Sequence, residues 1–189
     1  RHTTEELREL ISKSQEMYPK IWPGIKWSER KMQWTAPSGA TLWMSYLDKD
    51  QDVTKYQGLA FSWIGFDELT QWATPFAWNY MRSRLRTADP ELPLSMRATT
   101  NPGGRGHHWV KKMFIDPAPA GKPFIATDIE TGEQLKYPAG HARAGRPLFK
   151  RRFIPARLKD NPYLSQQGDY EAMLLSLPEH QRRQLLDGD

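Results

Sequence analysis

Two adjacent carboxylates, Asp67 and Glu68, end an uncharged aromatic run in this 189-residue chain, and they are the residues best placed to do chemistry. Such a pair suits phosphate chemistry, because one carboxylate can hold Mg²⁺ through its water shell while the other takes a proton from an attacking water. The alternative is a solvated turn after a core strand, and these two residues alone do not decide between the interpretations.

The run that precedes them begins at Gly58 and predicts the strand that positions the pair. It carries no charge and several aromatic residues, which is typical of a strand buried on both faces of a mostly parallel sheet. In open α/β sheets ligands lie at the carboxyl ends of the strands, where Asp67 and Glu68 emerge.

A second strand end follows in residues 96–104. It passes into Thr100 and Asn101 and then into a Pro-Gly-Gly turn that cannot continue a strand ladder. Hydroxyl and amide side chains can sense a terminal phosphate or orient a water, so we expect Thr100 and Asn101 to lie beside the first strand end.

Together the two strand ends resemble the large terminase subunit of tailed bacteriophages, the ATPase that packages viral DNA. The resemblance spans most of the chain, and its specificity lies in the order of its pieces rather than in any one of them. The pieces are Lys55-Tyr56-Gln57-Gly58, the strand to Asp67-Glu68-Leu69-Thr70-Gln71, Arg84-Leu85-Arg86, Arg97-Ala98-Thr99-Thr100-Asn101-Pro102-Gly103-Gly104, His108-Trp109-Val110-Lys111 and Asp160-Asn161-Pro162-Tyr163-Leu164.

The resemblance implies an α/β fold that is part of a RecA-like P-loop ATPase, with a mostly parallel sheet flanked by helices. We expect a core at about 1–115 and 148–189, and an irregular insertion at about 116–147. The family's phosphate-binding loop, Gly-x-x-x-x-Gly-Lys-Ser/Thr, is not in this sequence. In the family that loop lies before the part that matches Arg1, and an RNase H-like nuclease domain follows the ATPase domain. The chain therefore resembles the C-terminal two thirds of the ATPase domain, and we expect it to hydrolyse no ATP by itself.

The resemblance also implies site roles, with ATP and Mg²⁺ as cofactors. Asp67, at the end of a Walker B strand, would support Mg²⁺ through water, and Glu68 would be the general base. Thr100 and Asn101 would couple phosphate loss to movement. A helix predicted from Thr74 to about Thr87 carries three arginines, Arg82, Arg84 and Arg86. At most one or two of them would contact phosphates of nucleotide or of DNA, because 100° spacing prevents all three from sharing a face. The alternative is that they are ordinary surface arginines.

Charge is uneven along the chain, although the formal net charge is only +5. From Arg97 to Arg157 there are twelve Lys or Arg and four Asp or Glu, which favours a polyanionic partner. We take Lys150, Arg151 and Arg152 as the DNA-binding candidates. The alternative is a solvated basic surface with no partner.

The implied function is ATP-driven translocation of double-stranded DNA into procapsids, by a homo-oligomeric ring that works with a portal protein and a small terminase subunit in the host cytoplasm. The complete protein would then also be an endonuclease. Two alternatives stay open: another P-loop motor such as a helicase, and a non-enzymatic basic nucleic-acid-binding domain. No apolar run approaches the roughly 20 residues that span a bilayer, and the absence of cysteine excludes disulfides and thiolate metal sites.

Sequence patterns place the supporting elements. A capped helix begins at Thr3-Thr4 and should not extend far past Pro19. Residues 32–36 and 41–46 predict a β-hairpin around Pro37-Ser38-Gly39, and 124–129 with 134–137 predict a second. Helices are also expected at 108–114, 166–175 and 179–186, the last capped by Gly188.

Overall fold

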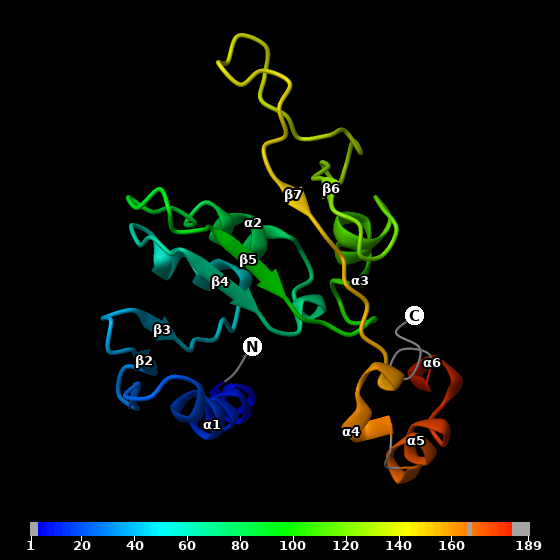
Figure 1. The fold of residues 1–189 in the computed structure, drawn as a ribbon. Helices are drawn as coiled ribbons and strands as arrows, with labels where there is room; N and C mark the ends of the chain where they lie inside the picture. Colours follow the sequence, from blue (N-terminus) through cyan, green and yellow to red (C-terminus); the bar gives the residue numbers. More distant parts are fainter. Residues whose placement is uncertain (1–3, 166–167, 183–189) are drawn as a thin grey trace. The chain divides into compact units, whose positions relative to one another are not determined.

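The computed structural model describes residues 4–165 and 168–182, and it shows a mixed α/β protein with small sheets (Figure 1). The chain forms two compact units. The first contains residues 1–67 and 76–97, and the second contains residues 68–75 and 98–189. The general prediction of an α/β fold is confirmed, and no described helix is long and apolar enough to cross a membrane.

The first unit opens with a helix and a three-stranded antiparallel sheet. Helix α1 spans Thr4–Ile21, and strands β1 (Lys26–Ser28), β2 (Gln33–Thr35) and β3 (Thr41–Trp43) follow in spatial order. The predicted hairpin is present as β2 and β3. The Trp34 indole on β2 donates a 3.0 Å hydrogen bond to the buried hydroxyl of Ser14 on α1, which joins helix and sheet.

Pro19 lies inside the last turn of α1, two residues before its end. Proline lacks the N–H that would bond the carbonyl four residues earlier, and its ring crowds that carbonyl, so it disfavours continuation of the helix. The helix ends at Ile21, so the prediction that it should not extend far past Pro19 is confirmed.

Two short parallel strands hold the predicted strand ends. Strand β4 covers Trp63–Phe66 and pairs with β5, Ser95–Ala98, and their arrows point the same way in Figure 1. In β4, Ile64 and Phe66 are buried while Trp63 and Gly65 are exposed, so one face is buried and not both as predicted. Alternating burial is what a pleated strand gives when a single face meets the core.

The helix in the segment that carries the three arginines is also shorter than predicted. A 3₁₀ helix, Asp50–Tyr56, precedes β4, and helix α2, Phe76–Arg82, follows it. The helix ends at Arg82 because the Ser83 hydroxyl donates back to the Tyr80 carbonyl at 2.7 Å, an arrangement that competes with helix propagation. Leu85 then pairs in parallel with Phe61, instead of lying in the predicted last turn.

The second unit is built from short elements. They are a 3₁₀ turn (Leu69–Gln71), α3 (His107–Val110) with a π-helical turn (Lys111–Ile115), β6 (Phe124–Ile125), β7 (Lys150–Arg151), a 3₁₀ turn (Leu158–Asp160), α4 (Pro162–Ser165), α5 (Gly168–Leu175) and α6 (Glu179–Arg182). Strands β6 and β7 are antiparallel. The predicted helix at 108–114 is present and buries Trp109, Val110 and Met113. The predicted end of the last helix, with Gly188, lies outside the described residues.

Candidate active site

The two predicted strand ends meet within the second unit. The Leu69 amide donates to the Thr99 carbonyl at 3.0 Å, and the Thr70 amide donates to the Thr100 hydroxyl at 3.0 Å. Hydrogen bonds therefore join the turn after Glu68 to the segment that leads to Asn101, which agrees with the expectation that Thr100 and Asn101 lie beside the first strand end.

Thr70 is the centre of this connection. It is 5% exposed, and its hydroxyl lies 2.8 Å from the Thr100 hydroxyl and 3.1 Å from the Asn101 carbonyl oxygen. The Thr100 oxygen accepts from the Thr70 amide, so its proton can go to the Thr70 hydroxyl, and the Thr70 proton to the Asn101 carbonyl. One assignment of protons therefore satisfies every donor, which makes the connection specific and stable.

The glycine-rich segment packs against the same turn. The Gly106 amide donates to the Thr70 carbonyl at 2.8 Å, and the Trp109 indole donates to the Trp72 carbonyl at 2.8 Å. A methyl group at Gly106 would lie 2.1 Å from the Trp72 carbonyl oxygen, and one at Gly104 would lie 2.8 Å from that of Thr70. Glycine is required at these positions because backbone meets backbone there.

His107 forms a hydrogen bond within the glycine-rich segment. Its Nδ1 accepts a 2.9 Å hydrogen bond from the Gly103 amide, so the neutral ring carries its proton on Nε2. Gly103 and Gly104 both have positive φ, at 88° and 78°. This left-handed backbone conformation favours glycine over residues that carry a Cβ. Trp109 and Gly106 are buried, so the loop has a fixed base.

Glu68 has a left-handed backbone, with φ 55° and ψ 55°. Such a conformation is uncommon for a residue with a Cβ and costs on the order of 1 kcal/mol. It is the second residue after β4, and it turns the chain into the 3₁₀ helix that contains Thr70. Glu68 is partly exposed, so its carboxylate is accessible to solvent.

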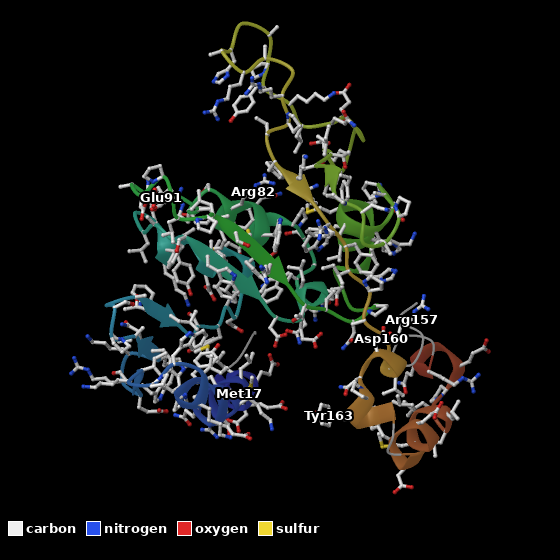
Figure 2. The ribbon with its side chains drawn as sticks, viewed as in Figure 1. Met17, Arg82, Glu91, Arg157, Asp160 and Tyr163 are labelled. Carbon is white, nitrogen blue, oxygen red and sulfur yellow. The ribbon has the colours of Figure 1, made fainter. Side chains whose placement is uncertain are left out.

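Asp67 and the three arginines belong to the first unit. Burial lowers the pKa of the Arg82 guanidinium below its usual value, and Arg82 lies at the end of α2 (Figure 2). Arg84 lies over the Tyr80 ring at 5.2 Å, and Arg86 donates to the Gly58 carbonyl at 2.9 Å. Arg84 and Arg86 therefore have contacts within their own unit. Arg82 and Arg84 are partly exposed, and Arg86 is exposed.

The three DNA-binding candidates are divided by the pleat of β7. Lys150 and Arg152 are exposed, whereas Arg151 is 9% exposed and donates to the Thr127 carbonyl at 3.0 Å. Its guanidinium also lies over the rings of Phe149 and Phe114, at 5.3 and 5.6 Å. The environment of Arg151 gives it a packing role, which leaves Lys150 and Arg152 as the accessible pair.

Among residues 4–165 and 168–182, no group of three or more His, Cys, Asp or Glu side chains is arranged to hold a metal ion. Mg²⁺ in phosphate-transfer sites is commonly held by one or two carboxylates together with substrate phosphates. An arrangement of that kind needs no more than one carboxylate from the protein.

Sequence reasoning did not single out Thr70, Gly106 or His107 as parts of the site. Thr70 and Gly106 could have been noticed as a hydroxyl next to the acid pair and a third glycine after the Pro-Gly-Gly turn. His107 belongs to no sequence pattern that reveals its bond to Gly103.

Comparison with protein families, with curated proteins and with solved structures finds no match to this chain. The interpretation of the site therefore depends on its residues and geometry.

Proposed function

We propose that this chain is part of an ATP-driven DNA-packaging motor of the large terminase subunit type. The observation that carries the proposal is the link from the turn after Glu68 to Thr99–Asn101 through the hydroxyl and amide of Thr70. A base residue and a neighbouring polar strand end, joined by hydrogen bonds, suit an enzyme that hydrolyses a phosphoanhydride and responds to loss of the phosphate.

Glu68 is the proposed general base. Its carboxylate is partly exposed at the end of a strand, and its left-handed backbone is held by the bonds of the following residues. Strained backbone conformations persist where the surrounding structure fixes them, and they concentrate at functional sites. This geometry supports a role in which Glu68 orients a water and takes its proton.

Asp67 is the proposed Mg²⁺ residue, and the ion, when bound with ATP, would neutralise charge on the phosphates. One carboxylate immediately before the base suits a hydrated ion that is shared with nucleotide. Asp67 is partly exposed, which allows a water shell between carboxylate and ion.

Thr100 and Asn101 are proposed to couple the site to movement. The Thr100 hydroxyl accepts a hydrogen bond from the Thr70 amide, and the Asn101 carbonyl accepts one from the Thr70 hydroxyl. Asn101 is itself exposed. A displacement of the turn after Glu68 must therefore strain bonds to both residues. The arginines Arg82, Arg84 and Arg86 are proposed phosphate contacts, of which at most one or two would reach a phosphate.

The remaining parts of the proposal follow from the resemblance. The partners would be double-stranded DNA, further copies of the protein in a ring, a portal protein and a small terminase subunit. The work would take place in the host cytoplasm and on the procapsid. A nuclease activity would belong to the complete protein.

The test is single-turnover ATP hydrolysis by the full-length gene product, across a Mg²⁺ titration. Glu68→Gln keeps size and polarity but cannot accept the proton, so nucleotide should still bind while hydrolysis falls by about 10²-fold or more. Asp67→Asn should instead shift the Mg²⁺ dependence to higher concentration. Glu91→Gln is the matched control, since Glu91 is an exposed acid of the first unit (Figure 2).

Normal hydrolysis in Glu68→Gln would refute the proposed chemistry. If the full-length protein binds DNA but neither binds nor hydrolyses ATP, a basic nucleic-acid-binding domain becomes the correct interpretation. ATP-dependent strand separation without packaging would identify a helicase.

A further inference from the structure

Residues 134–152 form a feature that we call the cationic hairpin. It contains six Lys or Arg residues and no Asp or Glu, and the carboxylate-free stretch continues to Arg157. In Figure 1 its loop, drawn in yellow, extends outward from β6 and β7. A second carboxylate-free stretch, residues 92–115, contains four Lys or Arg, so positive charge is denser in residues 134–152.

Backbone hydrogen bonds give the cationic hairpin a defined shape. The Leu148 amide donates to the Leu135 carbonyl at 2.9 Å, and the Tyr137 amide donates to the Arg146 carbonyl at 2.9 Å. Lys136 pairs with Pro147 in the same antiparallel ladder. The feature is therefore an ordered projection from the β6–β7 ladder, and not an unstructured basic tail.

The loop at its end is closed by side chains. The rings of Tyr137 and His141 stack at 4.5 Å with a 17° angle between their planes, and the Arg143 guanidinium lies 5.9 Å from the Tyr137 ring. The Gly145 amide adds a 3.0 Å bond to the Tyr137 carbonyl. These contacts hold Arg143 and Arg146 in one compact loop.

The cations of this loop face solvent. Lys136, Arg143 and Arg146 are exposed, as are Lys150 and Arg152 further along the same hairpin. Arg151 is the exception, since it is buried against Phe149 and Phe114. Positive charge without a neighbouring carboxylate attracts a polyanion, because no internal ion pair has to be broken first.

We propose that the cationic hairpin binds the phosphate backbone of duplex DNA through Lys136, Arg143 and Arg146. The partner rests on the proposed function, in which the protein moves double-stranded DNA. These three residues are distinct from Lys150, Arg151 and Arg152, which sequence analysis selected.

The aromatic residues favour a duplex over single-stranded nucleic acid. Single-strand binders stack bases on exposed aromatic rings. Here the Tyr137 ring already stacks on His141, and the Phe149 ring is covered by Arg151. What the hairpin offers a partner is a set of cations, which suits a backbone that is contacted without regard to sequence.

The test measures binding of a random-sequence DNA duplex to the full-length gene product as a function of salt. The variant combines Lys136→Gln, Arg143→Gln and Arg146→Gln. The control combines Lys26→Gln, Arg30→Gln and Lys31→Gln, exposed cations of the first unit, and removes the same charge. If each of the three contacts one phosphate, the slope of log K against log salt falls by about 2.7, so that raising salt from about 50 to 200 mM costs about 40-fold less affinity than in the wild type.

The control triple should leave the slope unchanged. A slope that is unchanged in the hairpin triple, or altered equally in both triples, would overturn the proposal. So would a loss of polyglutamate binding in the hairpin triple that equals its loss of DNA binding. Tyr137→Leu keeps every charge but removes the stack, and we expect weaker DNA binding with an unchanged slope. Glu68→Gln separates this proposal from the proposed function. Normal hydrolysis in Glu68→Gln, with a reduced salt slope in the hairpin triple, would refute the proposed function and support the cationic hairpin. Lost hydrolysis in Glu68→Gln, with an unchanged slope in the hairpin triple, would do the opposite.

Discussion

Substituting Gly106 by alanine tests the close approach on which the candidate site is built. The new methyl group would lie 2.1 Å from the Trp72 carbonyl oxygen, 2.6 Å from the Trp109 indole nitrogen and 3.1 Å from the Thr70 carbonyl oxygen. Two of these three atoms are backbone atoms, which cannot rotate away. Ordinary contact begins at 3.4 Å, so the Trp72 carbonyl must move by about 1.3 Å.

The size of the effect follows from what that movement breaks. Overpacking of this kind costs about 1–3 kcal/mol. The 2.8 Å bonds Gly106 N–H to Thr70 and Trp109 Nε1–H to Trp72 would also be lost or stretched, each with a net value of about 0.5–1.5 kcal/mol. We therefore expect Gly106→Ala to lower the free energy of unfolding of the second unit by about 2–6 kcal/mol.

Gly168→Ala is the matched control, because Gly168 lies in the same unit, has an ordinary φ and has no atom within 4 Å of the new methyl group. It should be neutral or slightly stabilising, since alanine favours the helix that begins there. The assay is urea denaturation, with amide hydrogen exchange over residues 68–75 and 98–110 to locate the loss. Equal stability of the two variants, with unchanged exchange in both segments, would refute the close packing of Gly106 on Trp72.

Two further predictions concern local backbone. Glu68→Gly should leave the unfolding midpoint close to that of the wild type, whereas Glu68→Val should destabilise by about 1–2 kcal/mol because a β-branched residue fits the left-handed region poorly; similar midpoints for both would show that φ at Glu68 is not positive in solution. The Thr131 and Glu130 amides hold the pKa of Asp128 below its usual value, so the turn they form is stable above the ordinary carboxyl range and weakens as pH falls through the lowered pKa. Amide exchange at Glu130 and Thr131 should therefore accelerate in acid, with Asp128→Asn removing that pH dependence and an unaltered dependence contradicting it.

The strand ends were predictable because their signals are local. An uncharged run that stops at Asp67, and a second short run that stops at a Pro-Gly-Gly turn, mark ends of strands by residue type alone. Parallel pairing of two such strands brings their carboxyl ends to one edge, and β4 and β5 do pair in parallel. The meeting of Leu69 with Thr99 follows from those two facts.

The burial of β4 was not predictable from the same run. Trp63 and Gly65 are typical of a core strand by composition, yet both are exposed. Burial depends on what lies over each face, and the strand's own sequence does not contain that information. The role of Thr70 was not predictable for a related reason, since its hydrogen-bond partner, Thr100, is thirty residues away in the sequence.

Charge shows the same limit most clearly. Lys150, Arg151 and Arg152 form the densest basic run by sequence, but a strand sends successive side chains to opposite faces, and Arg151 is drawn into an aromatic environment that stabilises its guanidinium. The cations that share an exposed loop are Lys136, Arg143 and Arg146, which are separated along the chain by glycine, alanine and proline. Those small residues are what allow the loop to close through Tyr137 and His141, so the spacing that conceals the cluster in the sequence also creates it in the fold.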